Sequence, residues 1–291
     1  MKILPLTVLF HEGPMARAYL EIMRREGFKA QTILRMVPAP GPLARWLPGG
    51  FRRSMSAMRN EKLANHWPRV LAERFPGLCR EMTDRIEGAF RLGDGFIAAL
   101  RGGGEIAAYA ETVHDIELRG LKDPALPQHL GRYVQTPILF TGGGILPPAV
   151  FAVPGIRLLH VHPGYLPPVK GADGLLWSTL VRGRPGASAF LMAPGLDVGD
   201  LLDASETEPL TFDIPEGERP GDDDLYRLVF SFYDPVLRAH ALRALLPLLE
   251  SGSELVGTPQ NEAEGLTYHF MEARMRHRAL ARLFRKDEAL S

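Results

Sequence analysis

The sequence contains a single cysteine, Cys79, among its 291 residues. One thiol cannot form an internal disulfide, nor can it supply a cysteine-rich zinc site. No uninterrupted apolar run approaches the roughly 18 to 20 residues that a membrane-spanning helix needs. Residues 1–10 are apolar but lack the small-residue cleavage site of a signal peptide, and residues 11–14 predict a turn. We therefore expect a cytoplasmic protein that does not enter a membrane.

The sequence also lacks an excess of charge of either sign, since 34 basic side chains stand against 34 acidic ones. Proteins that grip nucleic acid usually carry a basic surplus, because phosphate contacts supply most of their affinity. The arginines of residues 274–285 alternate with apolar residues at helical spacing, which predicts a solvated helix face. We expect a small-molecule partner and no nucleic acid.

The N-terminal third contains the pattern of an α/β fold. Apolar residues make up 45% of the chain, as in an ordinary globular protein. Residues 2–10 form a near-continuous apolar run, which predicts a strand buried on both faces of a parallel sheet. A helical pattern over residues 14–26 and a second strand over 29–37 complete a βαβ unit. We predict a doubly wound, mostly parallel, Rossmann-like sheet.

A helical segment interrupts this alternation. Residues 38–50 are rich in proline and glycine and predict a loop. Residues 54–100 have helical periodicity that breaks near Pro76. We therefore expect a helical insertion or lid over residues 38–105.

The chain divides into two predicted domains. Residues 1–210 would form the catalytic domain, and residues 211–291 a mainly helical extension. The extension opens with an acidic loop at residues 216–224, and a long helix then runs to about residue 250.

A predicted central strand at residues 156–162 carries two polar side chains at its end. Further strand candidates lie at residues 112–118, 137–140 and 187–192. His160 and His162 are two apart, so they point to the same face of a strand. In open α/β sheets, ligand sites lie at the carboxyl ends of the strands. We therefore place the candidate site at this histidine pair.

Asp197 follows the next predicted strand, in a loop bounded by Gly195 and Gly199. If the two strands are neighbours, Asp197 joins His160 and His162 at one edge of the sheet. A carboxylate beside a buried imidazole fixes its tautomer and raises its pKa, which suits general acid–base catalysis. A structural histidine pair remains an alternative, and so does a zinc or iron site. We expect no metal.

Two motifs in this region resemble those of a known family. Residues 162–167, His-Pro-Gly-Tyr-Leu-Pro, resemble the His-Pro-Ser-Leu-Leu-Pro motif of the 10-formyltetrahydrofolate-dependent formyltransferases. Residues 195–200, Gly-Leu-Asp-Val-Gly-Asp, resemble the Gly-Leu-Asp-Thr-Gly-Asp loop of the methionyl-tRNA branch. The clear resemblance spans residues 144–202, and a weaker one covers residues 1–200. The order and spacing of the motifs also fit this superfamily.

The resemblance implies roles for several residues. It implies transfer of a formyl group from 10-formyltetrahydrofolate, the co-substrate, to an amine. His162 matches the histidine that shuttles the proton, and Asp197 matches the aspartate that polarises it and orders a water. The family's pterin pocket, built largely from backbone groups, matches four positions: Gly144, Ile145, Leu146 and Val198.

One position departs from the family. His160 stands where the family has an asparagine that donates a hydrogen bond to the developing oxyanion. Loss of such a donor typically costs about two to three powers of ten in rate. A histidine ring N–H can also donate, more strongly when it is protonated, so the role can survive. A different reaction and an inactive relative remain alternatives.

Two other differences from the family limit which acceptor molecules we expect. Residues 11–14 are not the Gly/Ser-rich nest that purine-pathway members use for a phosphate. The predicted helical extension also differs from the β-rich domain of initiator-tRNA enzymes. We expect a small amine acceptor: an amino sugar, an amino acid or a hydroxylamine. Glu12 and Lys170 are the candidate acceptor contacts.

Two alternative functions stay open at this stage. The first is a formyltetrahydrofolate hydrolase, in which water takes the place of the amine. The second is a catalytically silent folate- or nucleotide-binding relative. The sequence specifies neither the pathway nor the oligomeric state, and a homodimer is one option.

Overall fold

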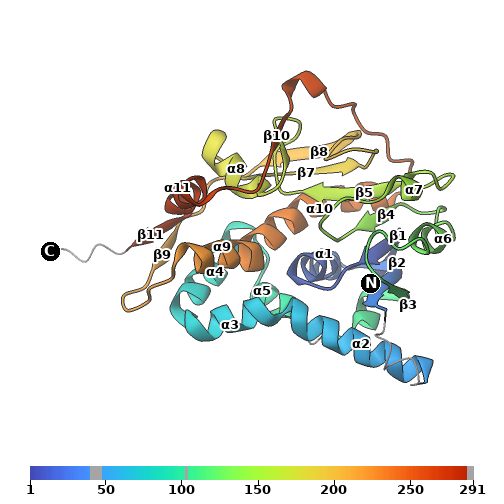
Figure 1. Cartoon of the computed structure of the whole chain (residues 1–291), viewed down its shortest axis with the longest axis horizontal. Coiled ribbons are helices and arrows are strands. Elements are labelled where there is room, and N and C mark those ends of the chain that lie inside the picture. Colours follow the sequence, from blue (N-terminus) through green and yellow to red (C-terminus); the bar gives the residue numbers. More distant parts are fainter. Residues whose placement is uncertain (40–47, 102–103, 287–291) are drawn as a thin grey trace.

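A computed structural model describes residues 1–39, 48–101 and 104–286. Its main sheet has seven strands in the order β3-β2-β1-β4-β5-β7-β8 (Figure 1). The strands are β1 (Lys2–Phe10), β2 (Phe28–Pro38), β3 (Ala110–Leu118), β4 (Ile138–Phe140), β5 (Leu158–His162), β7 (Gly186–Leu191) and β8 (Leu201–Glu206). The first five are parallel, while β7 pairs antiparallel with both β5 and β8. The predicted α/β fold with a mostly parallel sheet is confirmed.

Strand β1 lies near the centre of this sheet between two apolar layers. Leu6, Val8 and Phe10 belong to one core cluster, and Leu9 belongs to the other. All four side chains are fully buried. A strand covered on both faces needs apolar side chains on both, which explains the near-continuous apolar run in its sequence.

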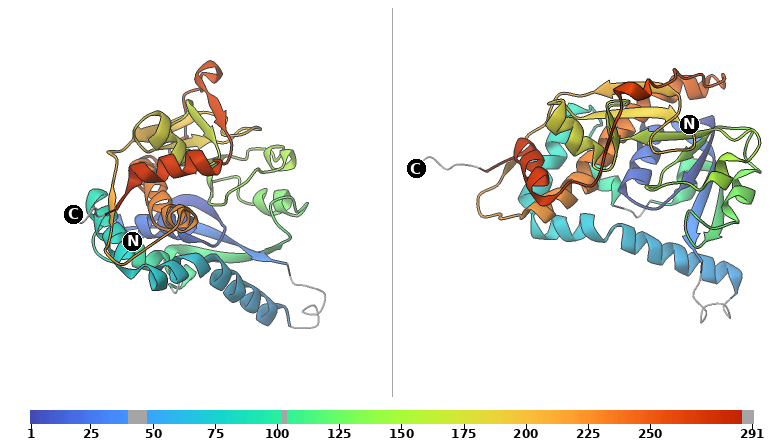
Figure 2. Two further views of the ribbon diagram at one scale, coloured as in Figure 1. Left: turned by 60° about the vertical axis from the view of Figure 1, so that its left-hand side comes forward. Right: turned by 45° about the horizontal axis from the view of Figure 1, so that its top comes forward.

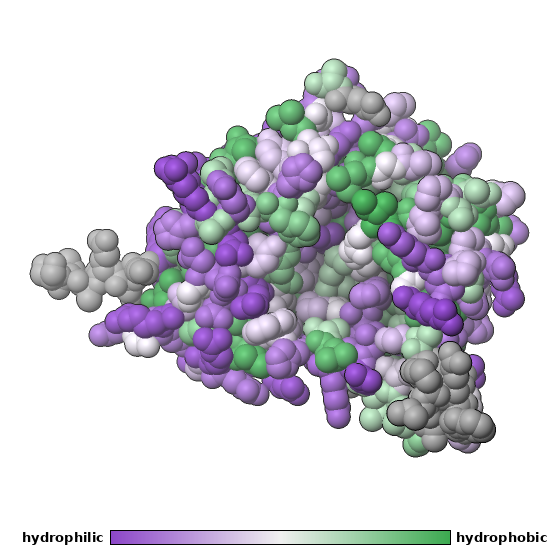
Figure 3. All heavy atoms as spheres, viewed as in Figure 1, coloured by the Kyte–Doolittle hydropathy of each residue, from purple (hydrophilic) through white to green (hydrophobic). Residues whose placement is uncertain are grey.

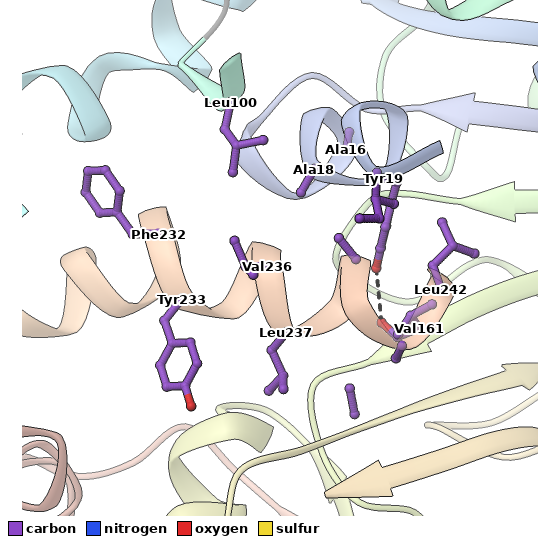
Figure 4. Packing of buried hydrophobic residues seen from close by; sticks show 14 of the residues in the cluster. Ala16, Ala18, Tyr19, Leu100, Val161, Phe232, Tyr233, Val236, Leu237 and Leu242 are labelled. Carbon is purple, nitrogen blue, oxygen red and sulfur yellow. Dashed lines mark hydrogen bonds between the residues drawn. The ribbon is translucent and has the colours of Figure 1, made fainter. Parts of the chain in front are cut away.

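Helices cover both faces of the sheet. On one face α1 (Pro14–Arg25) packs against α10 (Asp234–Glu250). Figure 4 shows Ala16 and Ala18 of α1 in this layer, with Val236 on α10. Such small side chains let two helices approach closely. The other face carries the short helices α6 (Leu126–Leu130) and α7 (Pro148–Phe151), whose buried residues join the second core cluster.

The helical insertion is present. It contains α2 (Gly49–Ala64), α3 (His66–Arg74), α4 (Pro76–Ala89), α5 (Phe96–Leu100) and η2 (Ile106–Tyr109). Figure 2 shows α2 to α4 along one side of the molecule, with α1 and α10 between them and the upper strands. The predicted loop at residues 38–50 falls mostly on residues 40–47, which lie outside the described residues.

The C-terminal part is helical over most of its length, with short strands that the sequence pattern did not predict. It contains α9 (Asp222–Leu228), η3 (Val229–Tyr233), α10, η4 (Glu262–Glu264) and α11 (Ala273–Leu283). The prediction of an acidic loop to residue 224 was wrong at its end, because Asp222, Asp223 and Asp224 form the first turn of α9. Acidic side chains are favourable there because a helix N-terminus carries a partial positive charge.

Two small parallel sheets join C-terminal segments to strands that come earlier in the chain. β6 (Val169–Gly171), which precedes α8 (Gly174–Val181), pairs with β10 (Leu266–Tyr268). β9 (Phe212–Ile214) pairs with β11 (Phe284–Lys286). Residues before and after position 210 also share one core cluster. A domain boundary at residue 210 stays a prediction.

Polar side chains cover most of the face in Figure 3, and the apolar ones form small separate groups. Within the described ranges, no helix is both long and apolar enough to cross a bilayer.

A carboxylate from the C-terminal part holds the start of an insertion helix. Glu218 accepts hydrogen bonds from the backbone N–H groups of Gly77 (2.7 Å) and Leu78 (3.0 Å), in the first turn of α4. These amides have no partner within the helix. We expect Glu218→Ala to lower the free energy of unfolding by about 1 to 2 kcal/mol, as measured by urea denaturation.

Glu216→Ala is the matched control, since its exposed side chain makes no hydrogen bond or ion pair with the part of the chain that is described. Glu216→Ala should change the free energy of unfolding by less than about 0.5 kcal/mol. Equal losses in the two variants would show that the contact with α4 contributes nothing.

Candidate active site

Strand β5 delivers the two histidines as predicted, on one face of the sheet. His160 and His162 are both buried, and Val161 between them belongs to the core cluster on the opposite face. The ring of His160 packs near the rings of Phe140 and Phe190. The strand therefore fixes the positions of both imidazoles through packing as well as through its backbone.

His160 has a defined tautomer. Its Nδ1 lies 3.0 Å from the backbone oxygen of Phe140, and because a carbonyl only accepts, Nδ1 carries the proton. Burial lowers the pKa of His160 to about 4, and the positive charge of Arg238 acts in the same direction. The ring is neutral near pH 7, so Nε2 presents a lone pair. The expectation that His160 could donate to an oxyanion is therefore wrong for this tautomer.

His162 is held between two acceptors. Its Nε2 lies 2.9 Å from the backbone oxygen of Val169, and its Nδ1 lies 3.3 Å from Oδ2 of Asp197. A neutral ring has one N–H and can satisfy only one of them, whereas the imidazolium satisfies both. Burial nevertheless lowers the pKa of His162, and the opposing effect of Asp197 is smaller. The prediction that the carboxylate raises the pKa of the imidazole was therefore wrong for His162. Desolvation lowers this pKa by more than the Asp197 carboxylate raises it.

Asp197 reaches His162 by a route that the sequence did not indicate. β5 and β7 are neighbours, but they are antiparallel, with Leu159 opposite Leu191. β7 therefore ends beside the start of β5, and the loop after it must fold back toward His162. The two strands are neighbours, and the predicted grouping of Asp197 with the histidines forms, although the antiparallel pairing was not predicted.

Backbone contacts hold this loop in place. Oδ2 of Asp197 accepts a hydrogen bond from the N–H of Gly171 (2.7 Å). The Gln260 side chain donates to the backbone oxygens of Asp197 (3.2 Å) and Gly199 (2.8 Å). Asp197 itself has a φ of 52°, in the left-handed region that asparagine and aspartate tolerate best among non-glycine residues. The carboxylate thus has a set direction before any ligand arrives.

A cavity of about 550 Å³ opens at the two histidines, a size typical of small-molecule sites. Gly143, Gly144, Ile145, Leu196 and Asp197 line one part of it. Its other lining residues include Asp173, Tyr226, Phe230, Arg238, Tyr268 and Phe270. A larger cavity, about 680 Å³, borders α2 and α3 but contains none of the predicted site residues. Size alone therefore does not identify the site.

The predicted pterin-contacting residues are only partly brought to the cavity. Gly144 and Ile145 line it, whereas Leu146 is buried in the second core cluster and Val198 is not among the lining residues. The backbone N–H groups of residues 142–146 form no hydrogen bond with any residue that the structure describes. A run of unpaired backbone donors beside a cavity fits a ligand with a hydrogen-bonding edge.

The two candidate acceptor contacts do not line this cavity. Glu12 is buried in a bidentate ion pair with Arg17, at 2.8 Å and 2.9 Å. Lys170 lies in β6, and its buried side chain packs against Gly265. The described part of the insertion contributes no lining residue either. A contact of Glu12 or Lys170 with the acceptor, and a lid role for the insertion, stay predictions.

Sequence reasoning missed other residues of the cavity. Asp173, directly before α8, has a φ of 53° and makes no cap hydrogen bond. Its carboxylate instead accepts from the Tyr226 hydroxyl (2.7 Å) and the Met271 N–H (2.8 Å). Arg238 lines the cavity from α10, and its spacing from Asp234 was its only signal in the sequence. Within the described ranges, no three His, Cys, Asp or Glu side chains are placed to hold a metal.

Part of the chain is similar to known formyltransferases. No family model matches the chain. A methionyl-tRNA formyltransferase of Syntrophus aciditrophicus (strain SB) is 36% identical over 106 residues, which cover 35% of this chain and 34% of that protein. One of Chloroflexus aurantiacus (strain ATCC 29366 / DSM 635 / J-10-fl) is 25% identical over 164 residues, or 55% and 51% of the two chains. These matches support the predicted resemblance to the formyltransferase superfamily.

The chain spans only about a third to a half of the length of those two curated relatives. Among solved structures, it resembles a sugar N-formyltransferase from Shewanella sp FDAARGOS_354, with 12% identity and a TM-score of 0.46 over 97% of this chain and 87% of that one. A 4-N formyltransferase from Francisella tularensis gives 11% identity and a TM-score of 0.46 over 97% and 86%.

The tautomer of His160 can be measured directly. By ¹⁵N NMR of the ring, we expect the neutral form with Nδ1 protonated at pH 7, and a change only as the pH approaches about 4. Because the folded pKa lies below the ordinary value of 6.5, the unfolded chain binds more protons between these values. This histidine therefore costs stability as the pH falls through that window.

The His160→Asn variant assigns the resonance, because the corresponding signal is lost. A proton on Nε2 at pH 7, or a midpoint near the ordinary value, would contradict the assignment of the Phe140 carbonyl as the acceptor.

Proposed function

We propose that this protein transfers a formyl group from 10-formyltetrahydrofolate to the amine nitrogen of a small acceptor. The observation that carries the proposal is the His162 imidazole, held between the Asp197 carboxylate and the Val169 carbonyl at the wall of the cavity. Similarity to methionyl-tRNA formyltransferases over part of the chain supports the reaction class.

The chemistry requires a group that holds a proton. The acceptor nitrogen forms a bond to the formyl carbon, the bond to the donor nitrogen breaks, and a proton passes from the first nitrogen to the second. His162 suits this task because it starts neutral and, once protonated, finds an acceptor at each ring nitrogen. Asp197 offsets the charge that appears on the ring.

The cavity has the features that a folate requires. A pterin presents a planar ring whose edge carries several donors and acceptors. The unpaired backbone N–H groups of residues 142–146 would read that edge. The aromatic side chains of Phe230 and Tyr268 line the same cavity and supply apolar surface for a flat ring.

The proposed amine acceptor is inferred from the negative charges that line the cavity. Asp173 and Asp197 both line the cavity. Carboxylates attract an amine in its protonated form and accept its N–H groups. We therefore propose a small amine, within the range of amino sugars, amino acids and hydroxylamines.

The test is turnover of 10-formyltetrahydrofolate by the purified protein with and without a panel of small amines, followed by absorbance of the tetrahydrofolate released. We expect amine-dependent release, because the acceptor nitrogen must displace the donor nitrogen. His162→Ala and Asp197→Asn should each lower kcat by about 10² to 10⁴, the usual contribution of general acid–base catalysis.

His277→Ala is the matched control, since this exposed histidine on α11 pairs with Asp222 and lies outside the cavity. It should keep wild-type turnover. Release without an amine would instead indicate a hydrolase. No turnover together with no tetrahydrofolate binding by calorimetry would refute the proposal.

A further inference from the structure

The arrangement of His160 leaves the developing negative charge on the formyl oxygen without the expected donor. Its Nδ1–H is occupied by the Phe140 carbonyl, and the neutral ring presents only a lone pair at Nε2. Asp173 and Asp197 add two carboxylates to the same cavity. An oxygen that becomes negative would therefore be repelled, unless another group donates to it.

Arg238 is the one arginine or lysine among the residues that line this cavity. Its side chain is 13% exposed, so the guanidinium is largely desolvated but still reaches the open space. Charge acts most strongly where water is excluded. Arg238 lowers the pKa of both His160 and His162, as expected of a cation close to the two rings.

Two contacts fix the guanidinium in place. Its Nε donates to Oδ2 of Asp234 (2.8 Å), and Nη1 donates to the backbone oxygen of Val161 (2.9 Å), the residue between the two histidines. The Tyr19 hydroxyl lies 3.5 Å from the same oxygen, as Figure 4 shows. Tyr19 is a further side-chain hydrogen-bond partner of the Arg238 guanidinium.

The position of Arg238 follows from the topology. α10 packs on the face of the sheet that carries Val161, opposite to the histidine side chains. β4 pairs with β5 only through Leu158 and Leu159, so the Val161 carbonyl is free of the sheet ladder on that side and accepts from Arg238. Arg238 therefore comes from the sheet face opposite to the histidine side chains. It lies at the carboxyl end of β5 and lines the same cavity as the two imidazoles.

We propose that Arg238 stabilises the negative charge that develops on the formyl oxygen, and so replaces the asparagine donor whose position His160 occupies. This rests on the proposed formyl transfer. A fixed cation at the cavity wall suits this role because it needs no reorganisation when the charge appears. Asp234, which is buried beside it, positions the guanidinium and makes no contact with the cavity.

The test combines substitutions at positions 238 and 160. We expect Arg238→Gln to lower kcat by about 10² to 10³, the usual cost of an oxyanion donor, with the acceptor KM and the calorimetric Kd for tetrahydrofolate little changed. His160→Asn restores an amide donor, so in the Arg238→Gln background it should recover at least about tenfold of the lost kcat.

Three controls accompany these variants. Arg243→Gln removes an arginine of the same helix that pairs with Glu26 outside the cavity, and it should keep wild-type kcat. Because Arg238→Gln leaves Asp234 unpaired, the double variant Asp234→Asn/Arg238→Gln keeps the pair neutral, and thermal unfolding checks that each variant folds. In ¹⁵N NMR, the pKa of His160 should rise in Arg238→Gln.

The outcomes separate the two proposals. No turnover by the wild type would overturn formyl transfer and, with it, the role of Arg238. Normal wild-type turnover with kcat unchanged in the folded Arg238→Gln variants would overturn only the role of Arg238. A raised acceptor KM at unchanged kcat would show that Arg238 binds an anionic group of the acceptor, and this also contradicts the proposal. If His160→Asn does not raise kcat in the Arg238→Gln background, this result would also contradict the role of Arg238.

Discussion

The His162 ring lies between a backbone carbonyl and a carboxylate, and the surrounding chain is shaped around that ring. A Cβ at Gly164 would lie 2.6 Å from Nε2 of His162, and a Cβ at Gly174 would lie 3.0 Å from the same atom. The first distance is shorter than a carbon–nitrogen contact allows, and the second is at the lower limit of such contacts. The two glycines therefore let the chain before α8 close around the imidazole, so that Val169 can accept from it.

The opposite acceptor depends on parts of the chain that are distant in sequence. Gly171 donates to the Asp197 carboxylate and has a φ of 98°, and a Cβ there would lie 2.1 Å from the Tyr268 oxygen. Gly171 therefore pairs with β10 and orients Asp197 at the same time. Gln260 adds two hydrogen bonds to the Asp197 loop. The C-terminal segment is consequently part of the site, although it contributes no residue to the strand that carries the histidines.

Charge balance within the cavity results from burial as much as from pairing. Desolvation lowers the pKa of both histidines, and the nearby Asp197 offsets it only in part. The buried Asp234 retains Arg238 in its charged form next to them. A neutral His162 between two acceptors can take up a proton without a change in position. This combination links the apolar packing of the fold to the proton transfer that we propose for His162.

The sequence by itself determined the α/β class, the shared face of His160 and His162, and the grouping of Asp197 with them, because strand periodicity and short motifs are local properties. It missed β8, and it missed β6, β9, β10 and β11, which have three residues each and pair with segments distant in sequence. Only the tertiary structure decided the tautomer of His160, the direction in which the pKa of His162 shifts, and the position of Arg238 at the cavity. These depend on desolvation and on contacts between residues far apart in the chain, and no local pattern records either.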